Sequence, residues 1–187
     1  MHCPFCQTPL KVDAAECLVC RITYPRTSQL VGALPRLSSV VADSTRQLSE
    51  AEITKLRKRI IEIETRFPQL ILNVVMHHFP TEHPFSMHAF WLFNASNYAG
   101  NSRRGKDNHA LLLTLDPARG DSAIVPGYGL ENHLKTEALD HLLHLASPAW
   151  QAQRWAEGIA QVLDGLDQLL ESVAIPQEIK TRKSSDY

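Results

Sequence analysis

The chain has 187 residues and a formal net charge of −1, and 44% of its residues are hydrophobic and 21% charged. This composition is that of an ordinary globular protein, with room for one domain and a small appendage. The near-neutral balance argues against nucleic acid or an anionic membrane as a partner. No apolar run approaches the roughly 18 residues that span a bilayer, and the first residues lack the basic and apolar regions of a signal peptide. We therefore expect a cytoplasmic protein without a membrane anchor.

All the cysteines lie within the first 20 residues, as two Cys-x-x-Cys pairs separated by ten residues: Cys3, Cys6, Cys17 and Cys20. Two disulfides are not expected in a reducing compartment. Two such turns place four thiolates near the corners of a tetrahedron, which is typical of a closed, structural Zn²⁺ site. The alternative is a redox pair or free thiols. We predict a zinc ribbon over residues 1–24, which has almost no core and would take its folding energy from the metal.

Residues 25–37 contain several Pro, Gly, Ser and Thr residues and are predicted to be a linker, leading into a strand near residues 38–41. Ser49, followed by Glu50 and Glu52, predicts a helix start, because a hydroxyl cap and early acids favour this end of a helix. Apolar residues then recur at steps of three and four until Pro68 ends the pattern.

Two apolar runs, 70–76 and 110–115, have the length and composition of buried strands. Aromatic residues predict a helix between them, and Asp, Pro and Gly after the second run predict a turn. The remaining predicted elements are a helix over 84–97, a strand over 122–126, helices over 130–145 and 150–173, and a disordered tail over 175–187. This order predicts an α/β domain over 38–174, a three-layer mixed β-sheet flanked by helices.

Four short stretches match landmarks of a known family. They are Val41 to Asp43, Leu48 to Glu52, Asp107 to Leu113, and the pentapeptide Gly127 to Glu131. In this order and spacing they resemble the TPM domain, over residues 41–172. The family includes a plant thylakoid-lumen phosphatase-like protein and many bacterial envelope proteins. This chain differs in having His109 where the family usually has Gly, and Thr136 where it commonly has Asp.

The resemblance implies binding of a divalent cation, typically Ca²⁺, and in some members a phosphatase activity. We hypothesise that Asp43, Asp107 and Glu131 converge to hold such an ion, because they stand at three of the family landmarks. The alternative is that Asp43 and Glu131 cap helices and Asp107 is a turn residue. Arg103 or Arg104 would clamp a phosphoryl group in a phosphatase, but the chain shows no motif for an activated nucleophile.

Histidines are concentrated after the first buried strand, at His77, His78, His83 and His88. We interpret them as half-buried or surface residues, with a second metal site as the alternative. The sequence therefore predicts an interaction or accessory module whose partner is another protein and whose ions are structural Zn²⁺ and Ca²⁺. The alternative function is a metal-dependent phosphatase of low activity.

Overall fold

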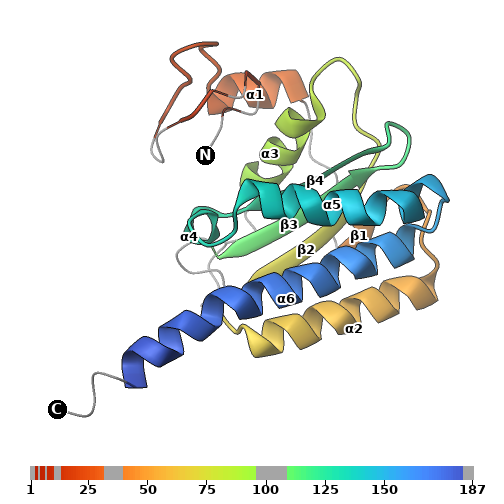
Figure 1. Ribbon diagram of the computed structural model, residues 1–187. Helices are drawn as coiled ribbons and strands as arrows, with labels where there is room; N and C mark the ends of the chain where they lie inside the picture. The colour runs from red at the N-terminus through yellow and green to blue at the C-terminus, as the bar shows by residue number, and fades with distance from the viewer. Residues whose placement is uncertain are drawn as a thin grey trace.

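A four-stranded mixed sheet forms the centre of the fold (Figure 1). The computed structural model describes residues 3, 5–6, 8–10, 14–31, 40–95 and 109–182, with only the backbone of residues 24 and 174–182. The strands are Val41–Asp43 (β1), Ile71–Met76 (β2), Ala110–Asp116 (β3) and Asp121–Pro126 (β4). They lie in the order β1-β2-β3-β4, with β1, β2 and β3 parallel and β4 antiparallel to β3.

Two helical crossovers connect the parallel strands, since parallel neighbours cannot be joined by a tight turn. Helix α2 (Glu50–Arg66) connects β1 to β2, and helix α3 (Phe85–Ala95) connects β2 to β3. The helices outside these crossovers are α1 (Tyr24–Val31), α4 (Tyr128–Glu131), α5 (Thr136–Gln151) and α6 (Trp155–Arg182). No helix within the described residues is both long and apolar enough to cross a bilayer.

Strand β3 supplies alternate residues to two separate cores, because successive side chains of a strand point to opposite faces. Leu111, Leu113 and Leu115 join the larger core, with residues of α2, α5 and α6. Ala110 and Leu112 join the smaller core, with residues of α3. Figure 1 shows α2, α5 and α6 side by side on one face of the sheet. The predicted three-layer α/β architecture is thus confirmed.

Helix α2 begins where the sequence predicts it. The Ser49 side chain accepts a hydrogen bond from the Glu52 amide, and the Glu52 carboxylate accepts one from the Ser49 amide, which completes a capping box. Ion pairs then join α2 to α6. The Asp167 carboxylate lies 2.9 Å from Arg59 Nη2 and 2.6 Å from Arg66 Nη1, and it is largely buried. A shared buried carboxylate fixes how these two helices align.

The structure differs from the expected elements at three places. Helix α1 occupies most of the predicted linker, and α6 continues to Arg182, past the predicted end of the domain at residue 174. The chain after β4 forms the short α4 and then α5, which runs through Pro148 to Gln151. Helix α5 ends there because Gln153 adopts a left-handed φ of 59° and Arg154 N donates back to Ala149 O at 2.8 Å.

Gly158 allows α6 to pack directly against the indole of Trp150 on α5. A Cβ atom added at this glycine would overlap Trp150 Nε1. Gly158→Ala should therefore lower the free energy of unfolding by about 1–3 kcal/mol, although alanine is the better helix former. Gly165→Ala is the matched control, since its Cβ would meet only the flexible end of Leu142. Urea unfolding of both variants measures the difference, and equal stability of the two would contradict this packing.

Candidate functional site

The cysteines lie on two short turns before α1. Cys3 N donates to Thr8 O at 2.8 Å, and Cys17 N donates to Ile22 O at 3.0 Å, so each pair begins with the same kind of backbone bond. An isolated antiparallel bridge between Glu16 and Thr23 joins the second turn to the start of α1. These bonds let two residues of each turn aim their thiols at the same space.

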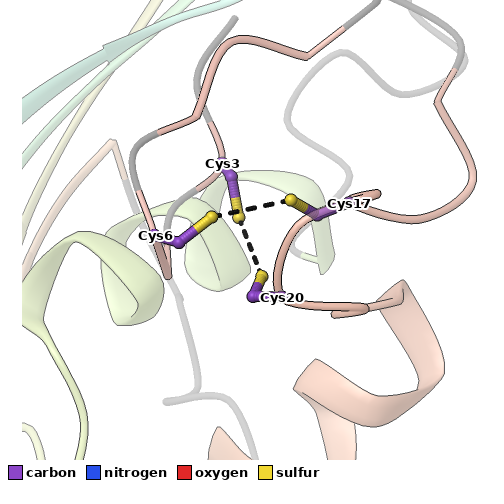
Figure 2. Close-up of side chains that lie close together, drawn as sticks. All are labelled: Cys3, Cys6, Cys17 and Cys20. Atoms are coloured by element: carbon purple, nitrogen blue, oxygen red, sulfur yellow. Dashed lines mark hydrogen bonds between the residues drawn. The ribbon is translucent and has the colours of Figure 1, made fainter.

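All four Sγ atoms lie within 4.8 Å of one another (Figure 2). The sulfurs of Cys3 and Cys20 lie 3.6 Å apart, and so do those of Cys6 and Cys17. A disulfide would bring the sulfurs to about 2.05 Å, so these are four free thiols. The close cysteine cluster that the spacing predicts is confirmed, and its ligand atoms are arranged to hold a metal ion.

The thiols differ in their electrostatic surroundings. Burial raises the pKa of Cys3 and raises the pKa of Cys20 to about 12. A hydrogen bond with Thr8 lowers the pKa of Cys6 to about 6. Sequence reasoning missed the role of Thr8. Its position two residues after Cys6 was the signal that could have pointed to it. Protons and a cation compete for these sulfurs, so metal binding here releases protons and weakens at low pH.

The tips of the two cysteine turns are apolar and exposed. Leu18 and Val19, between Cys17 and Cys20, are 80% and 65% exposed, and Phe5 in the other turn is 44% exposed. The ribbon's own small core consists of cysteines with Ile22 and Leu10. Helix α1 follows the cysteine turns in the chain and contacts α3, as Figure 1 shows. Helix α1, which follows the cysteine turns, therefore contacts α3, while the apolar tips of the turns are exposed.

Asp43 stands at the end of β1 and serves the loop that follows. Its Oδ1 accepts from Thr45 N at 2.8 Å and from Thr45 Oγ1 at 2.6 Å, and its Oδ2 accepts from Leu48 N at 2.8 Å. The carboxylate thus replaces missing backbone partners ahead of α2. Asp43 therefore stabilises the loop and is not the helix cap of the alternative interpretation, because Ser49 caps α2.

The structure does not bring Asp43 and Glu131 together. Asp43 aligns with Met76 and Leu115 at the carboxyl ends of the parallel strands. Glu131 follows Gly127, whose amide bonds to Ala110 O at the opposite end of the sheet. About 16 Å of strand separates the two ends, so one ion cannot touch both carboxylates. Asp107, like Arg103 and Arg104, lies outside the described residues.

Asp116 is a buried carboxylate that the sequence suggested only as part of a turn. Its side chain is fully buried and accepts from Phe79 N at 2.8 Å and Ala118 N at 3.0 Å, and it lies 3.2 Å from His78 Nδ1. It ties the loop after β2 to the β3–β4 turn. Its position directly at the end of an apolar run was the signal from which a buried role for Asp116 could have been predicted.

The four histidines after β2 do not converge on one point. The only group of three or more metal-ligating side chains in the described residues is the cysteine cluster. His77 Nδ1 lies 2.6 Å from Ser44 Oγ, whereas His78 contacts Asp116. His88 is 1% exposed, and neither of its ring nitrogens makes a hydrogen bond of regular geometry with a described residue. His77 and His78 therefore have separate local partners, and the rings of His83 and His88 lie beside each other with their centroids 6.4 Å apart.

Burial lowers the pKa of His88 from its usual 6.5, and it also lowers that of His77. The unfolded chain then binds more protons than the folded one, so the free energy of unfolding should fall as the pH drops below about 6.5. His88→Phe should remove part of this slope, by up to about 1.4 kcal/mol per pH unit. Urea unfolding between pH 5 and 8 measures it, with exposed His141→Phe as the control. An unchanged slope in His88→Phe would show that His88 is not the group responsible.

Comparisons with known proteins agree with this architecture. The TPM domain, a family also designated TPM_phosphatase, matches residues 41–169. An N-terminal domain from P. gingivalis is 24% identical, with a TM-score of 0.61, over 80% of this chain and 91% of that one. The N-terminal domain of the cg2496 protein from Corynebacterium glutamicum is 17% identical, with a TM-score of 0.55, over 73% of this chain and 82% of that one. No curated protein matches. The solved structures share the fold, and the match over residues 41–169 shows that the chain belongs to the TPM domain family.

Proposed function

We propose that this protein is an accessory interaction module, in which a zinc-bound ribbon docks a partner protein and the TPM domain is the scaffold that carries the ribbon. The observation that carries the proposal is the close set of four cysteine sulfurs beside exposed apolar tips. A metal-held turn presents such tips rigidly, which lowers the entropy lost on binding.

Zinc fits the donor set and its spacing. With Zn–S bonds of about 2.3 Å, the sulfurs of a tetrahedral Zn²⁺ site lie about 3.8 Å apart. The pairs Cys3–Cys20 and Cys6–Cys17 lie at 3.6 Å. Four thiolates leave no open position for a substrate, so an ion at this site would be structural. Cross-linking the two turns is the chemistry that it would supply when bound.

The apolar tips are the surface that we assign to docking. Leu18 and Val19 lie on the turn between Cys17 and Cys20. Arg21, directly after this turn, pairs with Glu16 at 3.2 Å. Apolar groups at the centre of a contact contribute most of the binding energy, and charged pairs at the rim contribute little. Truncating the tip should therefore weaken docking more than altering the nearby ion pair.

Native mass spectrometry should find one Zn²⁺ per chain, lost in Cys17→Ser. Leu18→Ser should retain the zinc and lose the partner, because it alters only the exposed tip. Ile61→Ser, at a residue 61% exposed on α2, should retain both. Cross-linking with quantitative mass spectrometry compares the partners of the three variants. A Leu18→Ser variant with an unchanged partner set would contradict docking through this tip, and a wild-type chain without zinc would contradict the ribbon.

Calcium binding and the phosphatase alternative have less support, since the described residues bring no three carboxylates together. Both proposals depend on the family resemblance and on the carboxylates of Glu131 and Asp107 as ligands. Calorimetric titration of the chain with Ca²⁺ tests them. A Ca²⁺ signal that Glu131→Gln abolishes and Asp43→Asn leaves unchanged would locate such a site beside α4. A titration without heat of binding would contradict calcium binding and leave the zinc-dependent interaction module as the proposed function.

A further inference from the structure

A groove of about 510 Å³ runs along the outer edge of β4. Helix α3 forms one wall, and α4 with the start of α5 forms the other. Phe90 and Phe93 from α3 and Leu139 from α5 give it apolar walls. The groove lies along the last strand of the sheet, and residues of both cores reach its walls, Leu139 from the larger core and Phe93 from the smaller.

The floor of the groove is the outer edge of β4, with which no strand of the described residues pairs. Gly127 N bonds to Ala110 O, so these two residues form a hydrogen-bonded pair of the antiparallel ladder. Such pairs alternate along the ladder, and therefore Ile124, opposite Leu113, directs its N–H and C=O away from β3. Pro126 also directs its carbonyl outward, and it has no N–H to satisfy. Along the floor of the groove, the Ile124 N–H donor is followed by the carbonyl acceptors of Ile124 and Pro126, in the pattern that an added strand would use.

The charge of the groove has one sign. Glu131 and Asp140 contribute carboxylates, and none of the described residues that line the groove is basic. A segment with lysine or arginine side chains complements this rim, whereas an acidic segment would be repelled. Apolar side chains on the alternate positions of the same segment would meet the aromatic wall on α3.

We propose that the groove binds an extended segment of a partner protein, with alternating apolar and basic side chains, as a fifth strand beside β4. This inference rests on the proposed role of the protein as an interaction module, but it uses a surface separate from the zinc ribbon. Backbone hydrogen bonds to Ile124 hold the segment, and the carboxylates of Glu131 and Asp140 select its charge.

The probe is a capped seven-residue peptide of alternating valine and lysine, titrated into the full-length, zinc-loaded chain labelled with ¹⁵N. The amide signals of Ile124 and its neighbours in β4 should shift with saturation. A peptide with glutamate in place of lysine should bind about tenfold more weakly at low salt. A valine–lysine peptide with an N-methyl group on every amide should not bind, because neither of its edges can donate to the Ile124 carbonyl.

Asp140→Asn should weaken binding of the valine–lysine peptide about two- to fivefold. Glu137→Gln, an exposed acid in the first turn of α5 that does not line the groove, is the matched control and should leave binding unchanged. Leu18→Ser should also leave peptide binding unchanged. The experiment therefore distinguishes a failure of the groove proposal from a failure of the ribbon proposal. Equal binding of the methylated and unmethylated peptides would overturn strand addition. A dimer in sedimentation equilibrium that blocks the peptide would overturn the proposal in favour of a second copy of the chain.

Discussion

Complete burial of β3 is the constraint on which the rest of the structure depends. All seven of its residues are buried, and the first six carry no charge. A strand in this position needs cover on both faces and neighbours on both edges. The crossover through α3 supplies cover on one face, and α2, α5 and α6 supply it on the other. Strand β2 and the returning β4 complete the two edges, so each surrounding element has a place set by this strand.

The elements that could be predicted from sequence are those with a local physical cause. The hydroxyl of Ser49 and the carboxylate of Glu52 signal the start of α2, and they form the capping box in the structure. The two apolar runs signal β2 and β3 because buried parallel strands need no alternation. Helix α1 carries a local start signal in Thr23, whose hydroxyl accepts from Arg26 N at 3.3 Å, but the Pro, Gly, Ser and Thr residues around it predict a linker instead. The contact with α3 supports this helix.

The candidate sites divide in the same way. The cysteine cluster could be predicted because each turn fixes two sulfurs and only two turns must meet. The proposed carboxylate site required knowledge of strand direction. Asp43 ends a forward strand and Glu131 follows the one that runs back, which places them at opposite ends of the sheet. Asp116 was missed because its role depends on Phe79, a partner distant in sequence.

The position of β4 between two helices also bears on the solubility of the protein. Exposed strand edges are starting points for fibrous aggregation, because a whole sheet can stack against them and offer a new edge in turn. Here α3 and α5 contact β4 from its two faces, and Pro126 interrupts the row of donors. A single strand can enter this slot, but the edge of a second folded sheet meets the helices first. The two helices beside β4 therefore oppose edge-to-edge growth of the sheet.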